Sequence, residues 1–344
     1  MRWLFEPRLV NEAFGDPGLY VDFRDERRAL LFDLGDIAAL PPRKLMRLSH
    51  VFVTHTHMDH FAGFDPLLRV LLGRKAALTL FGGPGFVAQV EHKLLAYTWN
   101  VVHRYDELAL DVREIGADGR TRRARFSSRT RFAREPLDAF DVRGDVLHEE
   151  ETFRVRGRFV DHDIPCLAYA IEEKAHVKVA KDRLEALGVS TGAWLRELKH
   201  AVLTGAPGST PIEVAWRDRE GDHAMTRRVD ELRHLILDVV RGQRIGYATD
   251  LRYTEANVAT LAELFADVDM LFIESVFLDE DAAHGARKNH LTAGQAGRIA
   301  RAARARSVQP FHFSPRYEGR EGELVAQVRA AWLDTQGPDA RSSA

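Results

Sequence analysis

The feature that most constrains this chain is the sequence His-Thr-His-Met-Asp-His at 55–60. It ends a strand-like segment, 50–55, whose apolar residues on consecutive positions are typical of a strand covered on both faces. Alternate residues of an extended chain share a face, so the first two histidines can point the same way as the chain turns into a helix. Nitrogen and oxygen donors at one strand end suit zinc or a similar ion. The sequence thus predicts a metal site with the donors His55, His57, Asp59 and His60.

The rest of the chain alternates strand-like and helix-like segments, which predicts a layered α/β fold. Between 112 and 160 the pattern weakens to short amphipathic strands rich in arginine. Other strands are expected at 18–23 and 28–35 (joined as a hairpin), 77–82, 166–173, 244–250, 269–275 and 307–313. Helices are expected at 61–73, 87–98, 257–266, 292–306 (with Thr292 as N-cap) and 321–333.

One segment, 174–233, differs from its surroundings because it is polar, helix-prone in two places and loop-like between 204 and 211. We interpret it as a peripheral, helical insertion within a single domain that spans 1–344. The last eight residues, 337–344, are expected to be disordered.

Composition excludes several classes of protein. With 49 Lys+Arg against 51 Asp+Glu, the chain is no basic nucleic-acid coat, although a local basic patch could still meet a nucleic-acid substrate. A single cysteine, Cys166, rules out internal disulfides and a cysteine-based zinc site. We interpret it as a small core residue.

The start of the sequence does not resemble a signal peptide, and no stretch approaches the roughly 18 apolar residues of a membrane span. We therefore expect a cytoplasmic protein without a membrane partner.

Further motifs place polar residues at other strand ends. Val-Asp-His-Asp-Ile-Pro puts His162 before a strand, Tyr-Ala-Thr-Asp puts Asp250 after one, and Gln-Pro-Phe-His-Phe-Ser-Pro-Arg-Tyr puts His312 at a third. Between the last two lie Phe-Ile-Glu-Ser-Val-Phe and Lys-Asn-His-Leu-Thr-Ala-Gly-Gln-Ala, and Leu-Leu-Phe-Asp-Leu-Gly precedes the histidine run. Taken in their order along the chain, from Ala29 to Tyr317, the motifs resemble those of the metallo-β-lactamase superfamily and, within it, of ribonuclease Z.

The resemblance implies a four-layer αββα sandwich with two metal ions at one edge. His55, His57 and His162 would hold one ion; Asp59, His60 and His312 would hold the second; and Asp250 would bridge both. We expect two Zn²⁺, with Mn²⁺ or iron as alternatives. Two ions about 3.5–4 Å apart can generate a hydroxide at neutral pH.

The resemblance also implies roles for residues near the metal ligands. Asp59 can orient or deprotonate the attacking water, and His290 would protonate the leaving oxygen or stabilise the phosphate. Glu274 would hydrogen-bond to a ligand or to His290, and Asp33 would brace the metal loop. Structural alternatives remain open: an exposed histidine before a helix cap for His290, and a buried polar strand end for Glu274.

Two groups of residues have less specific patterns. The segment 113–134 holds eight arginines, which indicates either a solvated face or a contact for RNA phosphates. The remaining histidines, among them His50 and His148, have no partner at ligand spacing and are left out of the site. The candidates for RNA binding are Arg120, Arg122, Arg123 and Arg125.

The sequence therefore favours a dinuclear-metal hydrolase that acts as a phosphodiesterase or endoribonuclease in tRNA processing. The alternative is a hydrolase of a small molecule, such as a cyclic nucleotide, a lactone or a thioester. A non-catalytic nucleic-acid-binding relative is disfavoured because all seven ligands are present. The chain departs from the family at Thr191-Gly192-Ala193, where an RNA-gripping arm usually has Gly-Pro, and it lacks the usual N-terminal Arg-Asn loop. RNA or a small phosphodiester is the expected partner, and the resemblance makes a homodimer an option.

Overall fold

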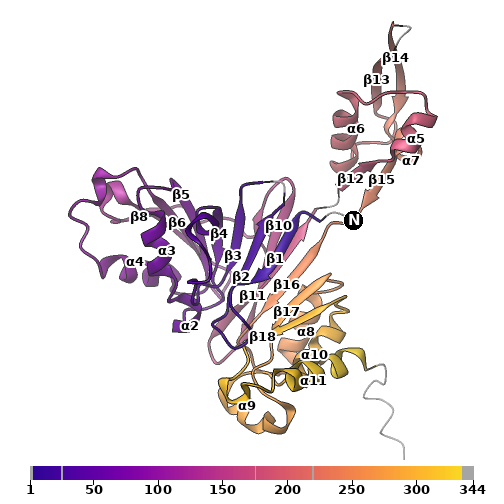
Figure 1. Ribbon diagram of the computed structural model, residues 1–344. Helices are drawn as coiled ribbons and strands as arrows, with labels where there is room; N and C mark the ends of the chain where they lie inside the picture. Colours follow the sequence, from indigo (N-terminus) through magenta and orange to yellow (C-terminus); the bar gives the residue numbers. More distant parts are fainter. Residues whose placement is uncertain (1–2, 25, 175, 219–220, 335–344) are drawn as a thin grey trace, which may run out of the picture. The chain divides into compact units, whose positions relative to one another are not determined.

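The computed structural model describes residues 3–24, 26–174, 176–218 and 221–334. The chain divides into two compact units, one formed by Met1–Glu172 with Gln243–Ala344 and the other by Glu173–Gly242 (Figure 1). The tail expected to be disordered, 337–344, lies outside the described residues. None of the described helices is long and apolar enough to cross a membrane.

The first unit contains a sheet of eight strands, each paired with the next along the chain. Strands β3 to β6 are parallel, so their carboxyl ends meet at one edge of the sheet. The predicted hairpin is confirmed as β2–β3, with Leu19 opposite Phe32. The strands are β1 (Phe5–Leu9), β2 (Leu19–Phe23), β3 (Ala29–Phe32), β4 (Leu48–Phe52), β5 (Ala77–Gly82), β6 (Ala109–Ile115), β7 (Thr121–Ser127) and β8 (Arg134–Leu137). The helices are α1 (Pro42–Leu45), α2 (Met58–Phe61), α3 (Phe64–Leu71) and α4 (Phe86–Leu95).

A second sheet has the order β18-β17-β16-β11-β10-β9. Strands β16, β17 and β18 are parallel, and β11 is antiparallel to β16, so the start of β11 lies at the same edge as the ends of the other three. The strands are β9 (Val146–Glu149), β10 (Phe153–Asp161), β11 (Pro165–Glu173), β16 (Arg244–Ala248), β17 (Met270–Glu274) and β18 (Val308–Phe311). The helices are α8 (Glu255–Leu264), α9 (Ala282–Lys288), α10 (Ala293–Ala302) and α11 (Glu321–Leu333).

Three apolar clusters hold these layers together. Alternation along β4 sends Val51 and Val53 toward α3 and α4, while Phe52 packs between the two sheets with Tyr169 and Tyr247. The third cluster lies between the second sheet and helices α8, α10 and α11. Figure 1 shows these helices beside the second sheet and α3 and α4 beside the first. The arrangement is helices, sheet, sheet, helices, which confirms the predicted four-layer sandwich.

Helix α10 begins where the sequence predicts. The Thr292 side chain accepts a hydrogen bond from the Gln295 backbone, and the Gln295 side chain accepts one from the Thr292 N–H at 2.9 Å. This capping box satisfies N–H groups that the first helical turn leaves without partners. It also fixes the chain just after His290, whose own N–H donates to Gly285.

The second unit has its own apolar core, which includes Leu198, Ile212 and Leu232. The two predicted helices are present as α5 and α6, but a helical insertion is an incomplete description. The unit also contains two antiparallel strand pairs, β12 with β15 and β13 with β14. Strand β13 directs alternate apolar residues toward the core, whereas β14 is mostly solvent-exposed. The elements are β12 (His176–Val179), α5 (Lys181–Ala186), α6 (Trp194–Leu203), β13 (Pro211–Asp218), β14 (Gly221–Arg228), α7 (Val229–Ile236) and β15 (Leu237–Val240).

Candidate metal centre

The seven candidate metal ligands gather at one edge of the first unit. The histidine run follows β4, and His162 lies in the turn between β10 and β11. Asp250 and His312 follow the parallel strands β16 and β18. Both of these residues have a positive φ, 53° and 59°. Such a backbone conformation is costly for a residue other than glycine, and residues that adopt it are concentrated at functional sites.

The first group of donors combines three imidazoles and one carboxylate. Ligand atoms of His55, His57, His162 and Asp250 all lie within 4.8 Å of one another. The Nε2 atoms of His55 and His162 are 3.7 and 3.4 Å from Asp250 Oδ2. His162 Nδ1 lies 2.9 Å from the Asn289 carbonyl oxygen, so it carries the proton and donates. The other nitrogen is left with a free lone pair facing the carboxylate.

The second group is formed by Asp59, His60 and His312, whose ligand atoms also lie within 4.8 Å of one another. The Nε2 atoms of both histidines are 3.5 Å from Asp59 Oδ2. His60 Nε2 lies 3.4 Å from Asp250 Oδ1, and His312 Nδ1 lies 3.1 Å from the same oxygen. Asp250 therefore presents one oxygen to each group.

These separations suit donors that share a cation. Two donors about 2.1 Å from one ion in tetrahedral geometry are about 3.4 Å apart. Most of the distances above are too long for hydrogen bonds. Among the described residues, His55 Nε2 and His60 Nε2 are buried and have no hydrogen-bond partner. Because a buried polar atom without a partner is costly, the residues present fit a bound metal ion.

The charges of the site also favour cations. Burial lowers the pKa of His60, but the carboxylates of Asp250 and Asp33 outweigh burial and hold the pKa well above its ordinary value. Likewise, burial lowers the pKa of His312, and Asp250 and Asp59 raise it to about 10. Burial raises the pKa of Asp250, but the surrounding imidazoles hold it well below the usual range. The carboxylates of Asp250, Asp59 and Asp33 therefore stabilise positive charge at this site.

Asp33 holds the histidine run in position. It follows β3 with a φ of 61° and is fully buried. Its carboxylate accepts hydrogen bonds from the Thr54 backbone at 2.7 Å and from the Tyr247 hydroxyl at 2.9 Å. It also lies 3.0 Å from His60 Nδ1, which fixes that nitrogen as the donor and turns Nε2 toward Asp250. Asp33 thus orients a candidate ligand from outside the ligand set.

His290 lies beside the ligands and is held by Glu274. Its Nδ1 is 2.7 Å from Glu274 Oε2, and its ring centroid is 5.0 Å from that of His162. Burial lowers the pKa of His290, but Glu274 raises it above the ordinary value. The fully buried Glu274 also accepts the backbone N–H of Leu251, so it is oriented by two neighbouring segments. His290 is partly buried within the site rather than exposed before the helix.

One cluster was missed by sequence reasoning. His50 and His148 were expected to have no partner, but their rings lie 4.2 Å apart, and His148 Nε2 is 2.7 Å from Glu150. The three offer ligand atoms at metal-binding separations. However, Arg28 donates to Glu150 at 2.6 Å and lies 3.4 Å from His50 Nδ1. The guanidinium already supplies the positive charge, so we assign no metal ion there.

The four arginines proposed to bind RNA lie outside the metal centre, at the turn before β7 and on β7. Each has an acidic partner in the first unit. Arg122, for example, donates to the buried Glu114 at 2.8 Å, and Arg123 forms two hydrogen bonds with Asp111. These pairs do not bury the guanidinium groups of Arg120 and Arg122, which stay 89% and 74% exposed, and contact with RNA stays a prediction from the sequence. The pairs are Arg120–Asp118, Arg122–Glu114, Arg123–Asp111 and Arg125–Glu107.

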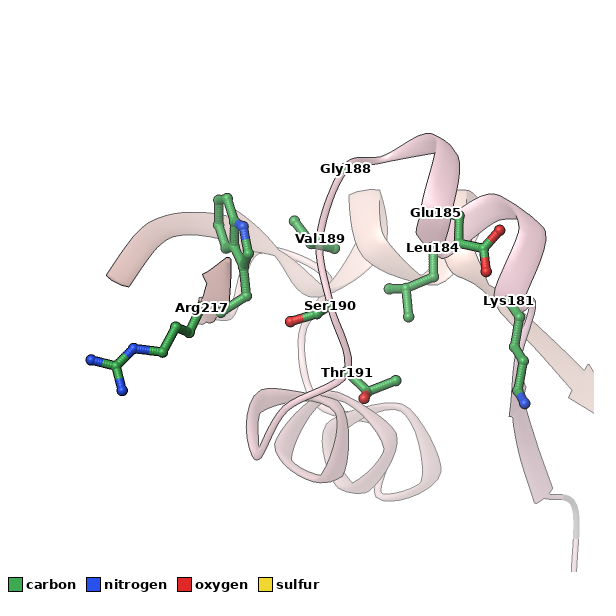
Figure 2. Close-up of a pocket in the computed structure, with 9 residues that line it drawn as sticks. Lys181, Leu184, Glu185, Gly188, Val189, Ser190, Thr191 and Arg217 are labelled. Atoms are coloured by element: carbon green, nitrogen blue, oxygen red, sulfur yellow. The ribbon is translucent and has the colours of Figure 1, made fainter. Parts of the chain in front are cut away.

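Two other expectations concern Cys166 and the second unit. Cys166 is fully buried, as predicted for a core residue, and its thiol donates to the Thr249 carbonyl at 3.3 Å. A hollow of about 520 Å³ in the second unit is lined by seven residues between Lys181 and Thr191 and by Trp216 and Arg217. Figure 2 shows Lys181 and Arg217 on opposite sides of the loop that carries Gly188 to Thr191. Among the described residues, this hollow contains no group of metal-ligating side chains.

Comparison with known proteins identifies the family. A model of the beta-lactamase superfamily domain matches residues 211–313. Ribonuclease Z of Deinococcus radiodurans is 30% identical over 328 residues, which cover 94% of this chain and 93% of that protein. This chain belongs to the ribonuclease Z family. Ribonuclease Z of Brevibacillus brevis is 26% identical over 334 residues, covering 94% of this chain and 88% of that protein.

Solved structures agree on the fold. The short form of human tRNase Z has a TM-score of 0.52 at 17% identity and covers 91% of this chain and 92% of its own. The metallo-beta-lactamase fold protein YhfI of Bacillus subtilis has a TM-score of 0.52 at 15% identity, with 96% and 93% covered. The predicted family, fold and enzyme class are therefore confirmed. The chain is a metal-dependent hydrolase of the ribonuclease Z family.

Proposed function

We propose that this ribonuclease Z family member is a phosphodiesterase that cleaves precursor transfer RNA near its 3′ end with the help of two zinc ions. The observation that carries the proposal is the pair of buried, unpartnered imidazole nitrogens of His55 and His60, which face the two oxygens of Asp250. Its second support is the similarity to ribonuclease Z over nearly the whole chain. Nitrogen and oxygen donors in this number favour zinc over calcium or magnesium, which prefer oxygen.

The residue roles follow from the two groups of donors. One ion would be held by His55, His57 and His162. The other would be held by Asp59, His60 and His312, and Asp250 would bind both ions. When bound, such ions make a water molecule more acidic and offset the negative charge of a phosphodiester.

The chain's own side chains would move the protons. Asp59 is the more accessible carboxylate, 41% exposed against 3% for Asp250, so it can accept a proton from a water molecule that enters from solvent. His290 would donate a proton to the leaving oxygen through Nε2, because Glu274 occupies Nδ1. Glu274 keeps the ring oriented, and Asp33 does the same for His60. In these roles, Asp59 would act on the side of the phosphorus where water attacks, and His290 on the side where the sugar oxygen leaves.

The second unit would contribute to RNA binding. This proposal rests on its compact fold with a separate core and on the known relatives, whose names specify a ribonuclease. The hydrolase alternative for small molecules has no observation of its own in its favour. Location in the cytoplasm and a homodimeric assembly stay predictions from the sequence.

Metal analysis together with an activity panel tests the proposal. The purified protein should contain about two zinc ions per chain and should hydrolyse bis(p-nitrophenyl) phosphate and precursor transfer RNA, but not a lactone. His57→Ala should lose metal and both activities, whereas His290→Ala should keep the metal and lose turnover. Hydrolysis of the lactone alone would favour the small-molecule alternative. Unchanged kcat in His290→Ala would exclude this histidine as the proton donor.

A further inference from the structure

A hollow of about 400 Å³ adjoins the candidate metal centre on the side of His290 and His312. Its walls come from three segments of the first unit: Phe14 in the loop between β1 and β2, Phe277 and Lys288 around α9, and Arg316 after β18. The volume falls within the range of about 300–1,000 Å³ that is typical of small-molecule sites. We call this hollow the Phe14 pocket.

The aromatic walls of the Phe14 pocket are held in fixed positions. Phe14 packs edge-on against Phe313, with ring centroids 5.5 Å apart, and Phe277 packs edge-on against His284 at 5.1 Å. The Phe313 N–H donates to the Ala13 carbonyl at 2.8 Å, which ties the Phe14 loop to the segment after β18. Rings that are already ordered lose little entropy when a flat ligand binds. These walls therefore suit a planar ring such as a nucleobase.

The polar walls carry positive charge. Lys288 is exposed and makes no ion pair within the part of the chain that the structure describes. Arg316 lies 3.4 Å from Asp281 and remains 46% exposed. The pocket also includes one carboxylate, that of Asp16, which accepts the Asp36 N–H at 3.0 Å. A phosphate next to a bound base would meet these two cations.

The position of His290 indicates which nucleoside the pocket takes. A separate, smaller hollow of about 210 Å³ is lined by His55, Thr56 and Pro84, whereas His290 and His312 line the Phe14 pocket. In a displacement at phosphorus, the attacking and leaving oxygens lie on opposite sides. The water oxygen forms its bond to phosphorus, the bond from phosphorus to the sugar oxygen breaks, and that oxygen takes the proton of His290 Nε2. The leaving nucleoside is therefore the one beside His290.

We propose that the Phe14 pocket binds the nucleoside on the leaving side of the cleaved phosphodiester, with its base against Phe14 and Phe277 and its other phosphate beside Lys288 and Arg316. The proposal rests on the proposed function, because it requires an RNA substrate and His290 as the proton donor. It assigns the choice of base at this position to a pocket of the first unit.

The test is a double comparison of variants and substrates. Phe14→Ala and the wild-type protein are assayed on three RNA substrates: intact, abasic on the leaving side of the cleaved bond, and abasic on the other side. We expect Phe14→Ala to raise KM about tenfold on the intact RNA, because stacking on the ring is lost. It should have the same effect on RNA that is abasic on the non-leaving side. On RNA that is abasic on the leaving side, the variant and the wild type should have equal KM.

Controls separate a lost contact from a damaged fold. Phe14→Tyr keeps the ring and should keep the wild-type KM. Lys288→Ala should weaken RNA binding and lower the salt dependence by about one phosphate contact. Arg329→Ala changes an exposed residue of α11 that does not line the pocket, and should leave both unchanged. A wild-type KM in Phe14→Ala, or an equal rise on all three RNAs, would overturn the pocket alone. If the wild type cleaves no RNA at all, the pocket and the proposed function both fail.

Discussion

At the scale of single residues, the site depends on side chains that orient other side chains. His60 and His162 each use Nδ1 as a donor, to the Asp33 carboxylate and to the Asn289 carbonyl, which leaves Nε2 facing Asp250. His290 is oriented in the same way by Glu274. The order of the donors along the chain does not reveal these second contacts. These second contacts explain why the buried carboxylates of Asp33 and Glu274 lie beside the histidines of the site.

The shared carboxylate gives the first prediction. Asp250→Ala removes the group that lies within 3.1–3.7 Å of four imidazoles, so we expect loss of bound metal and a fall in kcat/KM of at least about a thousandfold. Metal content by mass spectrometry and hydrolysis of bis(p-nitrophenyl) phosphate measure both. The control is Asp267→Ala, which also has a positive φ but pairs with Arg304. Full metal content in Asp250→Ala would refute the shared ligand.

A second prediction separates orientation from stability. Tyr247→Phe removes a buried hydroxyl that donates to Asp33, so unfolding should cost about 1–2 kcal/mol less and metal affinity should fall about tenfold. Tyr169→Phe is the matched control, because its equally buried hydroxyl donates to the Val53 carbonyl instead. Urea unfolding and metal titration distinguish the two. Equal metal affinities in both variants would contradict the role of Asp33.

At the scale of elements, parallel strands explain why distant residues meet. The ends of β3, β4, β16 and β18 lie at one edge, and each is followed by a candidate ligand or its support. Sequence alone could find the histidine run because its four donors lie within six consecutive residues. His162 and His312 were found only through the family resemblance. His50 and His148 were missed because no local pattern links positions 98 residues apart on two different sheets.

The cluster of His50 and His148 gives a prediction on pH. Burial, together with His148 and Arg28, lowers the pKa of His50 to about 3, against 6.5 in an unfolded chain. The folded state therefore binds fewer protons, so this contribution to stability is present above pH 6.5 and is lost as the pH falls toward 3. Between pH 6.5 and 5 the wild type should lose about 2 kcal/mol that His50→Gln does not lose.

Urea unfolding at the two pH values measures this difference. The exposed histidine variant His234→Gln serves as the control and should show the wild-type dependence. Parallel pH dependences of wild type and His50→Gln would mean that His50 is not neutral in the folded protein. The apo protein is used throughout, so that proton competition at the metal ligands does not enter the comparison.

At the scale of the whole molecule, the chain leaves and re-enters the first unit at one point. Strands β11 and β16 are already paired there, with Glu172 opposite Arg244. The sequence marked 174–233 by its change in composition, whereas the second unit runs from Glu173 to Gly242. It did not reveal the strands inside it, because five of the eight residues of β14 are polar and break the apolar alternation. The alternation of strands and helices predicted a layered α/β fold, but the four-layer order came from the family resemblance, because strands such as β8 are mostly exposed and have no clear apolar pattern.

This connection gives the last prediction. Replacing 174–242 by an Asn-Gly turn should leave the first unit folded, because a two-residue hairpin loop can join strands in this register. Hydrolysis of bis(p-nitrophenyl) phosphate should persist, while KM for precursor transfer RNA should rise about a hundredfold through loss of a linked contact. An unchanged KM for the RNA would show that the second unit takes no part in binding it.

The spread of the donors along the chain also has a consequence for how the protein is made. Four of them are synthesised by position 60, but the last, His312, comes only near the end of translation. A nascent chain on the ribosome can offer an incoming cation only an open half-site. If the proposed ligand assignment holds, both ions would be captured late in biogenesis, after the two sheets have closed against each other.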